Sequence, residues 1–284
     1  MEVDIPFEKP NIVVNSLIHP DTFFTAELTQ SNFILDTLDY FRYILDAQVE
    51  VYEDGNYLGD LLYDNLYFNY ANNTLFPKPG SIYELRVLKP NYELVTAQTT
   101  VPVAAPQFEI LNIQDVIGEF GNIEKELTIK ITDVPENSYY EFFIKEYQFN
   151  YNNASGNTIV EDSVLYRLGM MTSDLLVSPD GDIYYSNEFL FDDVLFRNSS
   201  YTFKLSLPYL SYNFTLNKLP PDYYLLISMR SIHEEYYKYK VSYNKQREVE
   251  FSPFAESVFV YNNINNGLGL FSSYYEYSMD TIIH

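Results

Sequence analysis

Side chains that could perform chemistry are few in this chain of 284 residues. It has no Cys, and none of its three His residues (His19, His233 and His284) has an evident nucleophile or orienting acid nearby in the sequence. A catalytic triad needs such partners, so we expect no catalytic residue. The lack of Cys also excludes disulfides, zinc–thiolate sites and thiol nucleophiles.

Two pairs of acidic residues are the remaining candidates for chemistry. Asp192 and Asp193 follow an aromatic run, and Asp180 and Asp182 flank Gly181. Two carboxyl groups could serve a glycoside hydrolase or bind Ca²⁺. However, the chain carries 40 acidic residues, which makes such pairs common, and the second pair lacks the downstream Glu of an EF-hand loop. We therefore interpret both pairs as solvated turn residues and expect no metal and no cofactor.

Aromatic side chains point to binding. The chain contains 29 Tyr and 21 Phe, and exposed Tyr supplies flat contact area at low entropic cost, which suits protein interfaces and sugar stacking. Tyr is also a preferred strand residue, so any single Tyr can have a purely structural role. Clusters in expected loops favour binding, and they give four candidate binding residues: Tyr147, Tyr151, Tyr209 and Tyr212.

The charge of the chain limits its partners. With 17 Lys and Arg against 40 Asp and Glu, the net charge is -23. Such a field repels phosphate backbones and anionic lipid headgroups. We therefore expect no nucleic-acid partner and no direct binding to an anionic membrane.

The elements that must position these residues are mostly strands. Short alternating runs of Val, Ile, Tyr, Phe and Thr, separated by Pro, Gly, Asn and Asp, predict a mainly β protein. Asp54 and Gly55 predict a tight hairpin turn. The segment from Tyr147 to Asn157 is expected to be a long exposed hairpin or loop, and residues 261–271 a structured turn. The expected strands are residues 11–18, 23–29, 47–52, 57–62, 82–88, 95–101, 108–113, 127–131, 139–149, 163–170, 201–207 and 223–229.

One helix is expected near residues 231–247. Ser231 and Glu234 fit a capping box, with Ser231 as the N-cap. Five cations and two acids in this segment could form a docking face for an acidic partner, although a helix that closes a β-domain, with Tyr inward, is the favoured interpretation. The residues expected to share one helical face are Ile232, Tyr236, Tyr239 and Tyr243.

The chain is long enough for two domains. Two prolines and two alanines within Pro102–Pro106 predict a linker. We expect a tether at residues 1–9, a small immunoglobulin-like or transthyretin-like β-sandwich at residues 10–104, and a larger antiparallel β-domain with the helix at residues 105–284.

Several segments, in their order along the chain, resemble a family of uncharacterised outer-membrane lipoproteins of Bacteroidota, the domain-of-unknown-function family four-two-four-nine. The resemblance covers nearly the whole chain, and it depends on the ordered set rather than on any single motif. The segments are IVVNSLIHP (12–20), AQVEVYEDG (47–55), PKPGSIYELRV (77–87), TAQTTVP (96–102), EYYKYKVSY (235–243), SPFAESVFV (252–260) and NINNGLGLF (263–271).

The resemblance implies a location and a partner but no catalytic residues. Family members look lipid-anchored through a Cys just before an acidic start similar to residues 4–10, and Met1 and Glu2 stand at that place here. They are commonly encoded beside SusC-like TonB-dependent transporters. The resemblance thus implies an outer-membrane protein that contacts the membrane through an N-terminal lipid.

Three functions follow as hypotheses. The leading one is a non-enzymatic lipoprotein that contacts a SusC-like transporter, another outer-membrane protein, or a glycan or peptide cargo through an aromatic surface. The second is a glycan-binding module that stacks sugars on Tyr. The third is a carboxylate-dependent glycoside hydrolase, which needs two acids facing each other across a cleft.

Overall fold

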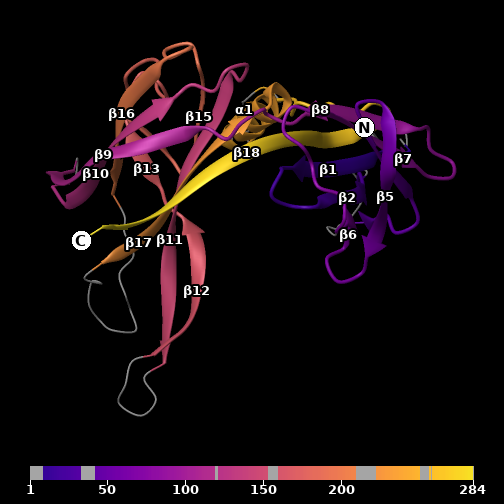
Figure 1. Cartoon of the computed structure of the whole chain (residues 1–284), viewed down its shortest axis with the longest axis horizontal. Coiled ribbons are helices and arrows are strands. Elements are labelled where there is room, and N and C mark those ends of the chain that lie inside the picture. The colour runs from indigo at the N-terminus through magenta and orange to yellow at the C-terminus, as the bar shows by residue number, and fades with distance from the viewer. Residues whose placement is uncertain are drawn as a thin grey trace, which may run out of the picture. The chain divides into compact units, whose positions relative to one another are not determined.

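The computed structural model describes residues 9–32, 42–118, 121–152, 159–208, 222–249, 256 and 258–283. These residues form a mainly β protein with one helix, which confirms the expected fold class (Figure 1). The chain forms two compact units: residues 1–103 with 232–275, and residues 104–231 with 276–284. The expected tether falls largely on residues 1–8, which lie outside the described ranges.

The first unit is a ladder of short strands. Along it the order is β1-β2-β6-β5-β4-β7-β8, with β3 beside β2. The strands are β1 (Ile12–Ile18), β2 (Phe24–Gln30), β3 (Arg42–Tyr43), β4 (Gln48–Glu53), β5 (Asn56–Asp64), β6 (Asn69–Asn72), β7 (Ile82–Leu88) and β8 (Val95–Thr100).

Both ends of this ladder contribute to one apolar core, as in a sandwich. Val14 of β1 and Val95 of β8 are buried in the same cluster. Near its centre, Phe24 and Tyr83 pack edge to face, with ring centroids 5.0 Å apart. Alternate residues of each strand face this core, for example in β7, where the pattern of burial has a period of two.

The predicted hairpin turn is present between β4 and β5. Asp54 and Gly55 have φ angles of 49° and 79°. A two-residue hairpin loop of the type that matches strand twist requires positive φ at both positions, which Asp and Gly tolerate. The local sequence therefore determines both the place of this turn and the register of the two strands.

The structured turn predicted over residues 261–271 is present at residues 265–267, but strand β18 (Leu268–Ile283), which was not predicted, begins directly after it. The first residues of β18 pair in parallel with β1, with Gly269 opposite Val14. Gly269 has φ 109°, and a Cβ there would lie 2.1 Å from the Val14 carbonyl oxygen. This close approach explains why glycine occupies a strand position, where it is otherwise unfavourable.

Because of strand β18 and the helix, the two units differ from the two domains that the sequence predicts. Ile264 and Phe271 fill the core of the first unit. Residues 232–275, which the sequence places in the second domain, therefore belong with residues 1–103. The boundary after Val103 lies within the predicted linker.

The helix α1 (Glu234–Val249) begins later than predicted. Ser231 lies in strand β17 (Tyr223–Ile232) and is fully buried, so it does not cap the helix. Instead, the carbonyl of His233 accepts the first helical hydrogen bond, from the amide of Tyr237 at 3.1 Å. Tyr236 is buried, and Tyr239 and Tyr243 stack on each other with ring centroids 5.9 Å apart.

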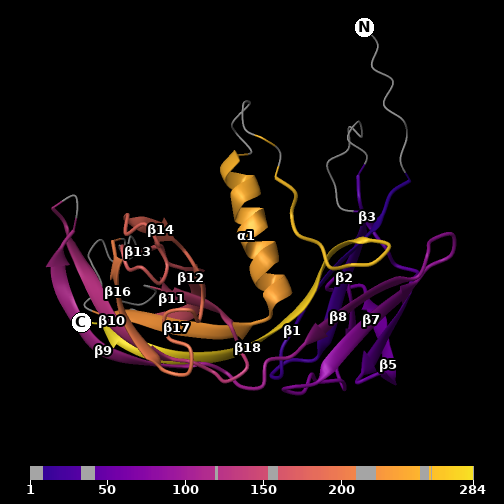
Figure 2. The same ribbon diagram turned by 90° about the horizontal axis from the view of Figure 1, so that it is seen from above.

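The second unit has two sheets (Figure 2). One has the order β12-β11-β17-β18, with β15 also paired to β11, and the other has the order β14-β13-β16-β10-β9. Its remaining strands are β9 (Gln107–Ile117), β10 (Ile123–Thr132), β11 (Tyr139–Asn152), β12 (Ile159–Arg167), β13 (Met170–Thr172), β14 (Tyr184–Ser186), β15 (Phe189–Asp192) and β16 (Ser200–Leu207).

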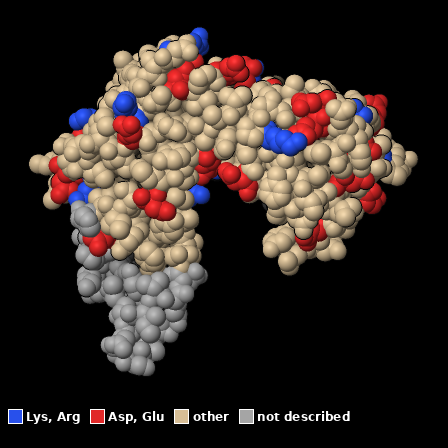
Figure 3. Space-filling view, viewed as in Figure 1, with Lys and Arg blue, Asp and Glu red and all other residues tan. Residues whose placement is uncertain are grey.

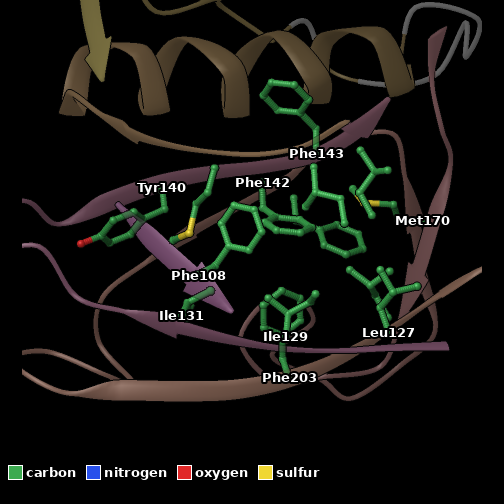
Figure 4. Packing of buried hydrophobic residues seen from close by; sticks show 14 of the residues in the cluster. Phe108, Leu127, Ile129, Ile131, Tyr140, Phe142, Phe143, Met170 and Phe203 are labelled. Atoms are coloured by element: carbon green, nitrogen blue, oxygen red, sulfur yellow. The ribbon is translucent and has the colours of Figure 1, made fainter. Parts of the chain in front are cut away.

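The core of the second unit lies between these sheets. Phe142 of β11 is fully buried and packs edge to face against Phe108 of β9 and Phe203 of β16 (Figure 4). Phe143, the next residue of β11, points away from them, to the opposite face of the strand (Figure 4). Even-numbered residues in this part of β11 therefore face the core, and odd-numbered residues lie on the outer face.

The segment from Tyr147 to Asn157 belongs to a hairpin, one of the two predicted alternatives. β11 continues to Asn152 and pairs with β12, which begins at Ile159, so residues 147–152 of the segment form one arm of this hairpin (Figure 1). Residues 153–158 lie outside the described ranges. The strand predicted at residues 139–149 stops short of the observed end at Asn152, because Asn is typical of turns.

Charged side chains do not form one large patch on the face drawn in Figure 3, where acidic and basic groups occur in several separate places. Within the described ranges, no helix is both long enough and apolar enough to cross a bilayer.

Candidate functional site

Aromatic side chains gather on the outer face of the four-stranded ladder β12-β11-β17-β18. Tyr147 and Phe149 of β11 have ring centroids 6.3 Å apart and planes 13° apart. The ring of Phe149 also packs edge to face on Tyr224 of β17, at 5.2 Å. Leu165 of β12 lies directly opposite Tyr147. We call these four residues the aromatic face.

Strand geometry explains why these residues meet. Positions 147 and 149 are two apart, so both side chains point to the same side of β11. Directly paired residues of antiparallel strands share a face, which places Leu165 beside Tyr147. Tyr224 and Leu165 are 38% and 37% exposed, so the face is accessible to a partner.

Tyr147 is the predicted binding residue that the structure describes best. Its hydroxyl donates a hydrogen bond of 3.0 Å to Asp280 of β18. This hydrogen bond raises the pKa of Tyr147, because the neighbouring carboxylate disfavours a phenolate. The ring is half-buried on a strand rather than free on a loop, and Asp280 fixes its orientation.

The other three predicted binding residues lie partly or wholly outside the described residues. The backbone of Tyr151 belongs to β11 and pairs with Val160, while its side chain lies outside the described part of the chain. Tyr209 and Tyr212 lie outside the described residues altogether. Phe149 and Tyr224 were not predicted as binding residues, although alternation of aromatic residues along β11 was a signal for the first of them.

A cluster of buried charges lies next to the aromatic face. Glu141 of β11 is fully buried and accepts hydrogen bonds from Arg230 at 2.9 Å and from Arg167 at 3.3 Å. Arg167 also binds Glu188 at 2.5 Å, and Arg230 binds Glu276 at 2.6 Å. We call these five residues the charge cluster.

Phe143 connects the charge cluster to the aromatic face along β11. The guanidinium groups of Arg167 and Arg230 lie 4.1 Å and 4.7 Å from the centre of its ring. Cations over an aromatic ring are attracted by its negative π face, and the attraction is stronger where water is excluded. Phe143 itself is fully buried, so these contacts are shielded from solvent.

The charge cluster joins all the strands that carry the aromatic face. Arg167 is in β12, Glu141 in β11, Arg230 in β17 and Glu276 in β18. Charge-assisted hydrogen bonds have strict geometry, so they fix these strands relative to one another. Binding surfaces on rigid strands lose little conformational entropy when a partner binds. The cluster thus supports the aromatic face mechanically.

The acidic pairs singled out in the sequence have structural surroundings. Asp180 and Asp182 are exposed in a turn, as expected. Asp193, however, is only 2% exposed, so its interpretation as a solvated turn residue is wrong. Both of its carboxylate oxygens accept hydrogen bonds of 2.8 Å from Arg197, and these bonds lower the pKa of Asp193. The Asp192 side chain accepts a hydrogen bond of 3.1 Å from the amide of Val194.

The described histidines also have structural contacts. The His19 ring stacks on Tyr274, with centroids 4.5 Å apart. His233 directly precedes the helix and contacts Glu235, and burial lowers the pKa of His233. His284 lies outside the described residues. In the part of the chain that the structure describes, no three His, Cys, Asp or Glu residues are grouped so that they could hold a metal ion.

The charge cluster predicts a pH dependence of stability through Glu276. Burial raises the pKa of this carboxyl, but the charge of Arg230 and hydrogen bonds from Ser278 and Arg230 outweigh burial and lower it below its ordinary value of 4.5. A lowered folded-state pKa stabilises the protein above the unfolded-state pKa, and this contribution is lost as the pH falls through the folded-state value.

We therefore expect Glu276→Gln to be less stable than the wild type at pH 7, with a difference that narrows from about pH 5 downward. Urea unfolding followed by circular dichroism at several pH values measures this difference. A difference that stays constant down to pH 3 would contradict the assignment to Glu276.

The fold and this face together define a two-unit, mainly β protein with a rigid aromatic sheet surface. The chain belongs to the family described as Domain of unknown function (DUF4249), whose model matches residues 1–279. No curated protein matches the chain.

Proposed function

We propose that this protein is a non-enzymatic outer-membrane lipoprotein that binds a TonB-dependent transporter, or the cargo of that transporter, through the aromatic face. The observation that carries the proposal is the set of contacts among Tyr147, Phe149 and Tyr224, on strands joined by the charge cluster. Aromatic side chains in pre-organised positions are typical of the residues that contribute most to protein interfaces.

The location and the partner come from the resemblance to outer-membrane lipoproteins encoded beside SusC-like transporters. Membership of the DUF4249 family supports that resemblance over nearly the whole chain. A net charge of -23 favours a protein partner with a neutral or basic contact surface.

The acidic groups support a binding role rather than catalysis. A glycoside hydrolase needs two carboxyl groups about 5–9.5 Å apart across a cleft, free to exchange protons with the substrate. Glu141, Glu188 and Glu276 instead form short hydrogen bonds with guanidinium groups. Carboxyl oxygens occupied by guanidinium groups in this way are poorly placed to transfer a proton to a substrate.

Recovery of a transporter from native membranes tests the proposal. We expect Tyr224→Ser to weaken binding about tenfold or more, because it removes a partly exposed aromatic anchor. Tyr166→Ser is the matched control: Tyr166 is 51% exposed in β12, one residue from Leu165 and therefore on the opposite face of that strand. The measurement is quantitative capture of solubilised outer-membrane proteins on the immobilised full chain.

Two outcomes would refute this function. One is capture in which no outer-membrane transporter is recovered by the wild-type chain. The other is a transporter recovered equally well by the wild type, Tyr224→Ser and Tyr166→Ser, which would place the contact elsewhere.

A glycan is the second candidate ligand. Tyr147 and Phe149 place two stacked aromatic rings on the outer face of β11, and aromatic rings are typical stacking partners of sugars. Binding on a glycan array that is lost in Phe149→Ser but kept in Tyr166→Ser would favour this ligand over a transporter.

A further inference from the structure

Strand β9 offers an open edge away from the aromatic face. It is the last strand of its sheet and pairs with β10 along one side. Within the described ranges, no other strand pairs with it. It is eleven residues long, from Gln107 to Ile117, and a strand edge of this length presents a row of backbone N–H and C=O groups.

An open groove of about 700 Å³ lies along this edge. On one side it is lined by consecutive β9 residues, including Phe108, Ile110 and Ile113. On the other side it is lined by alternate residues of β18, namely Tyr277, Met279 and Thr281. Successive side chains of a strand point to opposite faces, so a groove lined by consecutive β9 residues must follow the edge of that strand. The β18 residues that line it are every second one, so one face of β18 forms the opposite wall.

β9 and the groove-lining residues of β18 belong to the second unit, and β9 runs near the C-terminal part of β18 in both views (Figure 1 and Figure 2). The rings of Phe108 and Tyr277 are in contact at the base of the groove, 5.3 Å apart. Tyr277 and Met279 alternate with Glu276 and Asp280, so the groove and the aromatic face use opposite sides of β18. A ligand in the groove would leave the aromatic face free.

The edge of β9 is only partly protected against pairing: it carries a bulge and two acidic residues, Glu109 and Asp115, which form ion pairs with Lys130 and Lys125 of β10. Natural edge strands often carry Lys or Pro, and residues 107–117 contain neither. The register with β10 skips Leu111, which is a bulge, and leaves this side chain 52% exposed beside the groove. A bulge re-aims a side chain, and here it adds an apolar group to the groove wall.

We propose that this groove binds an extended segment of another protein, which adds to β9 as a further strand. The backbone of the segment would satisfy the open edge, and alternate apolar side chains would pack on Tyr277 and Met279. Glu109 also lines the groove and is 68% exposed, and the chain has a net charge of -23. The segment is therefore neutral or basic, which argues against a second copy of this acidic chain.

Selection from a displayed library of random twelve-residue peptides against the full chain tests this proposal. We expect enriched peptides with apolar residues at alternate positions and few acidic residues. Their affinity should fall at least tenfold in Leu111→Lys and in Thr281→Lys, two independent variants on opposite walls of the groove. Val194→Lys, which adds the same charge at an exposed position of the second unit away from β9 and the groove lining, should bind like the wild type.

Amide hydrogen exchange gives a second readout on the unmodified chain. An enriched peptide should slow exchange within residues 107–117, because pairing protects amides on the open edge. Three results would overturn the proposal: no enriched peptide, peptides that bind all variants equally, or peptides that leave exchange of β9 unchanged. A concentration-dependent dimer that Leu111→Lys dissociates would also overturn it, in favour of a second copy.

Discussion

Replacement of Arg230 with Met is expected to lower the free energy of unfolding by about 3–5 kcal/mol, because it removes one partner of a buried ion pair. Arg230 is 13% exposed and donates hydrogen bonds to Glu141 at 2.9 Å and Glu276 at 2.6 Å. Met fills a similar volume, so the loss reports on charge and hydrogen bonding rather than on a cavity.

The size of this effect follows from the burial of Glu141. Its carboxylate is fully buried, and an ionised carboxylate out of water is costly unless opposite charge and hydrogen bonds compensate for the lost hydration. In Arg230→Met the hydrogen bond from Arg167 remains, at the longer distance of 3.3 Å. Adding Glu141→Gln to Arg230→Met removes the buried negative charge that has lost its partner. The double variant should therefore be more stable than Arg230→Met alone, because substitutions of two contacting residues are not additive.

Lys204→Met is the matched control for this prediction. Lys204 also forms an ion pair at 2.8 Å, with Glu126, but its side chain is 59% exposed. Exposed pairs contribute about 0–1 kcal/mol, so this variant should unfold almost like the wild type. Urea unfolding followed by circular dichroism compares the wild type, Arg230→Met and Lys204→Met, and the double variant Arg230→Met/Glu141→Gln beside them. Equal stability of Arg230→Met and Lys204→Met would show that the charge cluster does not stabilise the second unit.

Local sequence patterns predicted most strands because each strand is an alternating run bounded by turn residues. Residues 82–88 are predicted with the same bounds as β7, and the Asp54–Gly55 turn is predicted with its mechanism. Both depend only on neighbouring residues and on strand periodicity. Where a strand contains Asn or Gly, the local pattern was less informative: the predicted strand ended before Asn152, and a turn was predicted at Gly269.

Non-local pairing explains what the sequence did not reveal. β18 pairs in parallel with β1, about 255 positions earlier in the chain, as in the match of Val13 with Leu268. No local pattern specifies such a partner, and the same pairing places residues 232–275 in the first unit. The helix start was misplaced for a related reason: Ser231 satisfies a capping pattern but belongs to a buried strand.

In the candidate site, too, local sequence predicted one residue, whereas non-local strand pairing brought the others to it. Tyr147 was predicted because aromatic residues cluster around it in the sequence. Its neighbours Tyr224 and Asp280 come from strands far along the chain, and only the sheet order β11-β17-β18 brings them together. The charge cluster joins Glu141 to Glu276 across the second unit, so a chain with 40 acidic residues gives no sequence signal for these particular ones.

A second large loss of stability is expected on the inner side of the same strand, where Phe142 alternates with Glu141 and Phe143. Phe142→Ala should cost about 3–5 kcal/mol, because truncation of a fully buried aromatic residue loses its transfer free energy and leaves a cavity. Phe108 and Phe203 pack against Phe142 at 5.8 Å and 5.7 Å, from strands β9 and β16 of the facing sheet (Figure 4). The cavity would therefore open between the two sheets.

Binding of a small apolar ligand distinguishes a cavity at position 142 from general damage to the fold. An apolar cavity lined by aromatic residues stays dry and can hold benzene, so benzene should stabilise Phe142→Ala in urea unfolding and leave the wild type unchanged. Val194→Ala is the control, because Val194 is 68% exposed in the same unit and its truncation should change stability by no more than about 0.5 kcal/mol. A cost below about 1 kcal/mol for Phe142→Ala would mean that the sheets close over the vacated space, since this cost depends on how well the site collapses.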